Sequence, residues 1–171
     1  MKRMVAFILS LFLIGCATPT IKATKQLNVD PLGVVAVLPF SGYHGDQFAD
    51  SVAQELMLLG ARIVERSRIT SVLIEQGLSI ADITRGQINY EKIGGLLGVD
   101  TLILGSVSPI VVYASGAPSG KVSTAAMRVV SVKTGTVVGS ATYSANTELL
   151  AGSVLYPEAA ARLVRALTQG Q

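Results

Sequence analysis

Gly33-Val34-Val35-Ala36-Val37-Leu38-Pro39-Phe40 is a continuous apolar run that decides the fold. Its length and its valine content are typical of a β-strand, and the lack of polar alternation indicates a strand that is buried on both faces. Pro39 has no backbone N–H to donate to a neighbouring strand, so we expect the strand to end there. The run therefore predicts a central strand in a sheet that helices cover.

Helices and strands alternate after this run, which is the pattern of an α/β domain. A first helix extends to about Leu59 and precedes Gly60, a residue suited to a left-handed cap. A strand over 61–65, two helices and a second apolar strand over 99–107 follow. Helical spacing predicts the inward residues of the three helices: Phe48, Val52, Leu56 and Leu59; Ile69, Val72 and Leu73; and Tyr90, Ile93, Leu96 and Leu97. The predicted N-caps of the second and third helices are Ser67 and Asn89.

The C-terminal part of the chain reads as a β-hairpin and a helix. Strands over 122–132 and 136–144 flank Lys133-Thr134-Gly135, and a glycine in so short a connection favours a hairpin turn. Pro157 starts a terminal helix with an apolar stripe. The predicted fold class is α/β: a mixed β-sheet of about five strands, helices packed on it, and a C-terminal helix.

The first sixteen residues have the order of a lipoprotein signal. Met1-Lys2-Arg3 is a positive start, an apolar segment follows, and Cys16 is the only cysteine of the chain. The apolar segment is shorter than the ~20 residues that a membrane-spanning helix needs. Leu13, Ile14, Gly15 and Cys16 resemble a bacterial lipobox, in which the cysteine receives the lipid. The alternative is an ordinary secretory signal in which Cys16 is incidental.

This interpretation divides the chain into three parts. Residues 1–15 are the signal peptide, residues 16–32 are a lipid-anchored flexible tether without a regular element, and residues 33–171 are the α/β domain. Residue 17 is alanine, and by resemblance to enterobacterial sorting this indicates the outer membrane. The expected localisation is therefore the periplasmic face of the outer membrane, with the membrane contacted through acyl chains.

The composition excludes several classes of function. Lys2 and Arg3 leave with the signal, so 12 of the 14 basic residues remain against 11 acidic ones, without a basic run that would suit nucleic acid. A single histidine, His44, and a lipidated cysteine leave no metal-ligand cluster and no disulfide. We expect no metal and no cofactor other than the covalent lipid on Cys16, and no small-molecule substrate.

Catalytic patterns are weak in this sequence. Ser41, His44 and Asp46 lie within six positions of one loop, where a catalytic triad rarely reaches its geometry, and the G-x-S-x-G turn is missing. Neither a P-loop nor a G-x-G-x-x-G fingerprint is present. We therefore expect that the protein is not an enzyme, and an envelope hydrolase is the remote alternative.

An ordered set of short motifs resembles a known family. The motifs include Glu65 and Arg66 before a helix, Glu75 and Gln76 at its end, Gly105 in a strand, and Arg128 and Gly135 in the hairpin, spread over residues 33–145. Together they are similar to the curli-secretion lipoproteins of the CsgG-like family. The resemblance implies a periplasmic core of the CsgG/TolB N-terminal type that lacks the transmembrane hairpins of that family. The core also resembles lipoprotein activators of peptidoglycan synthases and a flagellar-assembly lipoprotein.

Two classes of function follow from this resemblance. In the first, the domain is a protein-binding component of an envelope or secretion system, and a partner adds a strand to the edge of the hairpin over 122–144. That edge could instead be packed under the C-terminal helix. In the second, the chain is a ring-forming subunit of a curli-like secretion channel. The sequence does not identify the partner: an amyloid subunit, a murein synthase, a flagellar part and another copy of this chain all stay open.

Arg66 is the polar residue to which the sequence assigns a structural role. We expect its guanidinium to pair with a carboxylate, with Glu75 as the candidate partner, and to lock the preceding strand to the helix. Replacement of Arg66 by alanine should then lower the melting temperature.

Overall fold

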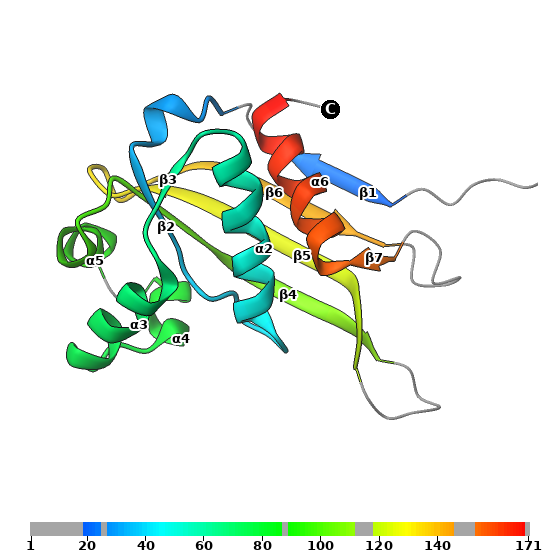
Figure 1. Ribbon diagram of the computed structural model, residues 1–171, viewed down its shortest axis with the longest axis horizontal. Helices are drawn as coiled ribbons and strands as arrows, with labels where there is room; N and C mark the ends of the chain where they lie inside the picture. Colours follow the sequence, from blue (N-terminus) through cyan, green and yellow to red (C-terminus); the bar gives the residue numbers. More distant parts are fainter. Residues whose placement is uncertain (1–18, 25–26, 87–88, 112–117, 146–152, 170–171) are drawn as a thin grey trace, which may run out of the picture.

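The computed structural model describes residues 19–169 except 25–26, 87–88, 112–117 and 146–152 (Figure 1). Its strands are β1 Thr20–Ala23, β2 Val34–Val37, β3 Arg62–Ile63, β4 Thr101–Val111, β5 Pro118–Ser131, β6 Val137–Ser144 and β7 Val154–Leu155. Its helices are the 3-10 turn η2 Asp30–Leu32, α2 Gly45–Leu58, α3 Arg66–Glu75, α4 Ile80–Thr84, α5 Tyr90–Leu97 and α6 Tyr156–Gln169.

The strands form one mixed sheet in the order β1-β6-β5-β4-β2-β3, with β7 paired to β5. β2 runs parallel to β3 and to β4, whereas β4, β5, β6 and β1 pair antiparallel. The predicted fold class, a mixed sheet with packed helices and a C-terminal helix, is confirmed, with seven strands among the described residues in place of about five.

Helices cover the two faces of the sheet unequally. α2 and α6 pack side by side on one face, and α3, α4 and α5 cover the other face near β2 and β4 (Figure 1). Alternate residues of β2 and of the position after it therefore enter different cores: Val35 and Val37 face α2 and α6, while Ala36 and Leu38 face α3–α5. All four are nearly inaccessible to solvent. This burial on both faces confirms the central strand that the apolar run predicts.

Three predicted details of the helices are wrong. Leu59 and Leu96 are exposed, because Leu59 follows the last residue of α2 and Leu96 lies on the solvent side of α5. Ser67 is inside α3, whose N-cap is Glu65 without a side-chain capping bond. The cap of α5 is as predicted: the Asn89 side chain accepts a hydrogen bond from the Glu91 N–H at 2.8 Å.

Part of the segment over 16–32, predicted as a tether without regular structure, enters the sheet. β1 pairs antiparallel with β6, from Thr20 opposite Ser144 to Ala23 opposite Ala141. Next to β1, the Ser140 N–H donates to Thr24 Oγ1 at 3.0 Å, and the Leu27 N–H donates to the Leu167 carbonyl of α6 at 2.6 Å. The globular domain therefore begins near Thr20 and not at residue 33.

The same pairing corrects the predicted docking edge. β5 lies between β4 and β6, and β1 covers the outer side of β6 from Ala141 to Ser144, so this part of the hairpin is not a free edge for a further strand. The turn itself is as predicted, with Gly135 at φ 64°, a left-handed conformation that favours glycine. The main strand order ends at β1 and β3, and β7, which pairs with β5, lies off this order.

Two tyrosine rings are buried in the core on the face of the sheet that α2 and α6 cover. Burial raises the pKa of Tyr143 in β6, with smaller and opposed effects of the nearby Arg162 and Glu158. Burial also raises the pKa of Tyr156, whose hydroxyl donates to the Tyr43 carbonyl at 3.1 Å. Both rings therefore belong to the packed core of this face.

Neighbouring glycines of α5 offer a test of the packing. A methyl group on Gly94 would overlap the side chain of Val132, whereas a methyl group on Gly95 would meet open space. We expect Gly94→Ala to destabilise the fold by ~1–3 kcal/mol through overpacking. Gly95→Ala should stabilise it by ~0.5–1 kcal/mol, the difference in helix propensity. Urea unfolding of both variants measures this, and equal effects of the two substitutions would contradict the packing of α5 on Val132, the residue after β5.

Candidate functional site

An open groove lies between α2 and α3 beside β3, one of the outermost strands. Its volume is about 1020 Å³. The apolar part of its lining comes from the helix and strand residues Val37, Ala49, Ala53, Met57, Ile63 and Val64, and the polar part from Asp50, Gln54, Glu65, Arg66, Ser67 and Thr70. We call this feature the α2–α3 groove.

Exposed apolar side chains mark one end of this groove. Met57, which lines it, is 53% exposed, and Leu58 and Leu59 next to it are 74% and 39% exposed. Three consecutive exposed apolar residues are unusual on the surface of a monomeric protein and often mark a binding surface. A signal for this was present in the sequence, since Leu56-Met57-Leu58-Leu59 is too wide an apolar run for one helix face.

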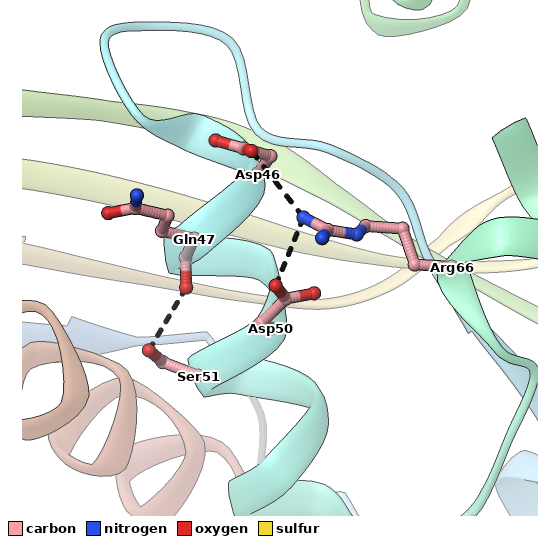
Figure 2. Close-up of polar contacts among 5 residues, drawn as sticks. All are labelled: Asp46, Gln47, Asp50, Ser51 and Arg66. Atoms are coloured by element: carbon pink, nitrogen blue, oxygen red, sulfur yellow. Dashed lines mark hydrogen bonds and ion pairs between the residues drawn. The ribbon is translucent and has the colours of Figure 1, made fainter.

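An arginine bridges the two helices at the other end of the groove. Arg66, the first residue of α3, places a guanidinium nitrogen 3.0 Å from the Asp50 carboxylate and 3.5 Å from that of Asp46, both on α2 (Figure 2). A cation at a helix N-terminus opposes the helix dipole, and the two carboxylates offset this. All three side chains are about half exposed, so the ion pairs contribute at most ~1 kcal/mol.

This arrangement corrects the predicted partner of Arg66. Glu75 is the last residue of α3, nine residues after Arg66, and a helix separates such residues by ~14 Å along its axis. A direct pair within the helix is therefore impossible, and Arg66 instead ties α3 to α2. Arg66 thus connects two helices from different layers, α3 and α2, and does not connect α3 to the strand before it as predicted.

The remaining motif residues are dispersed over the fold. Glu65 lines the groove, and Glu75 and Gln76 lie at the exposed end of α3. Gly105 is buried in β4 against the Ala126 backbone and the Phe40 ring, where a side chain would not fit. Arg128 lies in β5 on the sheet, and Gly135 in the β5–β6 turn. Cys16 and the rest of the predicted lipobox, Leu13, Ile14 and Gly15, lie outside the described residues.

The loop after β2 separates the three residues considered as a triad. The Ser41 hydroxyl donates to the Gly105 carbonyl at 3.3 Å, the His44 ring packs edge-on against Tyr43, and Asp46 pairs with Arg66. Each side chain thus has a different contact. Among the described residues, no group of three or more His, Cys, Asp and Glu side chains is placed to hold a metal ion.

A second groove, of about 790 Å³, lies between α5 and the segment over 27–32. Its polar groups hold the backbone together: Asp100 accepts from the Val34 N–H at 2.8 Å, and the Thr101 hydroxyl donates to the Leu32 carbonyl at 2.7 Å. These contacts attach the turn before β2 to the start of β4. Their role is structural, so the α2–α3 groove is the stronger candidate.

In the part of the chain that the structure covers, no helix has the length and apolarity to cross a bilayer.

The α2–α3 groove joins an outer strand, an apolar surface and charged side chains. A peptide segment can satisfy all three, because backbone pairing provides affinity and side-chain pockets provide selection. The geometry therefore suits the binding of another polypeptide.

Comparison with known proteins gives similarity in fold. No protein-family model matches the chain, and no curated protein matches it in sequence. The PelC dodecamer from Paraburkholderia phytofirmans superposes with a TM-score of 0.55 and 16% identity, over 87% of this chain and 98% of that chain. Lipoprotein GNA1162 from Neisseria meningitidis superposes at 0.52 with 18% identity, over 69% and 90%. The C-terminal domain of LpoB from Escherichia coli gives 0.46 with 17% identity, over 85% and 96%.

These findings correct the expected family. The predicted membership of the CsgG-like curli-secretion family is wrong, because the chain superposes on PelC and GNA1162 and no family model supports CsgG. The short motifs that carry the resemblance are mostly structural here, such as Gly105 under Phe40 and Gly135 in its turn. Residues of this kind accompany a fold and do not identify a family.

The bridge across the groove leads to a testable coupling. Arg66→Ala and Asp50→Ala should each lower the unfolding free energy by up to ~1 kcal/mol. Their double variant should lose less than the sum of the two, because both remove the same contact. Arg66→Ala with Glu75→Ala serves as the control, and its effects should be additive. Thermal or urea unfolding at low salt measures both cycles; coupling of Arg66 to Glu75 in place of Asp50 would contradict the structure.

Proposed function

We propose that this chain is a protein-binding lipoprotein of the bacterial envelope, anchored through Cys16 at the periplasmic face of the outer membrane. The observation that carries the proposal is the α2–α3 groove beside β3, with the exposed Met57 in its lining and the exposed Leu58 and Leu59 next in the chain. Apolar side chains exposed in this manner favour contact with another protein.

The anchor is supported by the lipobox-like residues and by the comparisons. Leu13-Ile14-Gly15-Cys16 ends the apolar segment at the position where a lipoprotein signal is cut. One protein of similar fold, GNA1162, is named a lipoprotein. We extend the proposal to an absence of catalysis: the domain would act by binding, and the polar residues of its groove would select the partner.

Self-association is a second candidate, and a specific observation favours it. PelC, whose fold is similar over 98% of its own chain, is described as a dodecamer. Copies of this chain could likewise assemble into a ring, with the groove of one copy holding a segment of the next. A peptidoglycan synthase or a flagellar-assembly protein, the partners that the sequence resemblance implies, are the alternatives to a second copy.

Site-specific photo-cross-linking in whole cells tests the proposal. A photoreactive amino acid in place of Leu58 should form a protein adduct, because Leu58 is exposed and directly follows Met57, which lines the groove. The same amino acid in place of Val137, which is 50% exposed at the start of β6, should form none. The added mass distinguishes a second copy of this chain from another envelope protein.

A variant that introduces a charge into the apolar part of the groove tests whether the adduct depends on binding there. Met57→Glu should abolish the adduct at Leu58, since a buried carboxylate is unfavourable in an apolar contact. Light scattering of the detergent-extracted protein then reports whether a discrete oligomer dissociates. The absence of an adduct at Leu58, or one that persists with Met57→Glu, would refute binding at this groove.

A further inference from the structure

The start of β1 limits how far the domain can stand from its anchor. Thr20 is the first residue of β1, and three residues separate it from Cys16. An extended chain spans at most ~3.6 Å per residue, so Thr20 lies within ~14 Å of a lipid on Cys16, whatever the conformation of the link. The short link therefore determines which end of the sheet is closest to the bilayer.

That end of the sheet is the one at which the β4–β5 hairpin projects. Thr20 is opposite Ser144, which is opposite Thr124, which in turn is opposite Ser108. β4 continues for three residues beyond Ser108, up to Val111 opposite Pro118, which adds ~10 Å along the strand. Figure 1 shows the start of β1 and the far end of the β4–β5 pair on the same side of the domain. The ~10 Å by which β4 and β5 extend beyond Ser108 is most of the ~14 Å that the link allows between Thr20 and the lipid on Cys16.

We propose that the surface around Leu155 and Tyr43, at this end of the domain, lies against the phospholipid headgroups of the membrane that holds the anchor. The inference rests on the proposed lipidation of Cys16. It adds an orientation to that proposal: the domain is held on the bilayer surface in one pose and does not hang free in the periplasm.

The chemistry of this surface suits a bilayer interface. Leu155 of β7 is 57% exposed and pairs with Lys121 of β5, which is also exposed. Tyr43 is 51% exposed, and its carbonyl accepts the hydrogen bond from Tyr156, the residue after Leu155. Apolar, tyrosine and lysine side chains are the groups that favour the headgroup region, where an apolar part is buried and a polar end stays hydrated.

The backbone near Tyr43 holds the loop in this position. His44 has φ 52° and ψ 33°, a left-handed backbone conformation that is unfavourable for residues other than glycine. Its ring packs edge-on against that of Tyr43, with the ring centroids 4.0 Å apart. The Tyr156 hydroxyl fixes the Tyr43 carbonyl from the other side. The loop is thus presented in a defined shape.

The opposite end of the sheet provides a matched control. Val137, at the start of β6, is 50% exposed, close to the value for Leu155. It is seven residues from Ser144 along the strand, or ~24 Å. The inference places Val137 away from the bilayer and Leu155 in contact with it.

The absence of tryptophan from the chain makes the experiment direct. Leu155→Trp and Val137→Trp each give the full-length lipidated protein a single tryptophan, and each is reconstituted into phosphatidylcholine–phosphatidylglycerol vesicles with and without brominated acyl chains. Emission from Leu155→Trp should shift to shorter wavelength in vesicles and be quenched by the brominated lipid. Emission from Val137→Trp should show neither change. Tyr43→Trp repeats the test from the loop.

Flotation of the vesicles separates this inference from the proposal on which it rests. If the protein floats with the vesicles but Leu155→Trp and Tyr43→Trp are not quenched, the anchor stands and the orientation is refuted. If the protein does not float, both are refuted. Equal quenching of Leu155→Trp and Val137→Trp would refute a single pose, and quenching of Leu155→Trp and Tyr43→Trp alone supports it.

Discussion

The burial of β2 on both faces is the constraint on which the rest of the structure depends. Val35 and Val37 face one core, and Ala36 and Leu38 face the other, so helices are required on both sides of the sheet. α2 and α3 meet this need from opposite faces. The sheet between them ends at β3, a strand of only two residues. The α2–α3 groove is the gap at this margin, and Arg66 bridges it by pairing with Asp46 and Asp50. The candidate binding surface is thus a consequence of how the two layers are joined.

The strands and helices that could be predicted from the sequence are those with a strong local pattern. The apolar run before Pro39, the Asn89 cap and the Gly135 turn each depend on a few neighbouring residues, and each lies where it was expected. β1 has no such pattern, because it joins the sheet through backbone pairing with β6, more than a hundred residues later in the chain. The edge predicted for the hairpin over 122–144 was wrong for the same reason: whether a strand is an edge depends on distant parts of the chain.

The candidate site was difficult to predict for a related reason. Its residues come from α2, β3 and α3, and their side chains have no catalytic or metal-binding spacing that a sequence search would recognise. The two partners of Arg66, Asp50 and Asp46, lie 16 and 20 residues earlier in the chain, on a helix of the opposite layer. Only the packing of the layers brings these three residues together. The consecutive apolar residues Met57–Leu59 were visible in the sequence. Their exposure could not be predicted, because it depends on where α2 ends and on which elements pack against α2.

The lipid attachment proposed for Cys16 is the premise of the membrane-facing end, because only an anchored domain would be held against a bilayer in one pose. Intact mass spectrometry of the protein extracted from bacterial membranes tests this claim most directly. The account predicts a polypeptide that begins at Cys16 and carries the added mass of acyl chains, with the mass on the N-terminal peptide. A chain that retains residues 1–15, or one that begins after them without any added acyl mass, would contradict it.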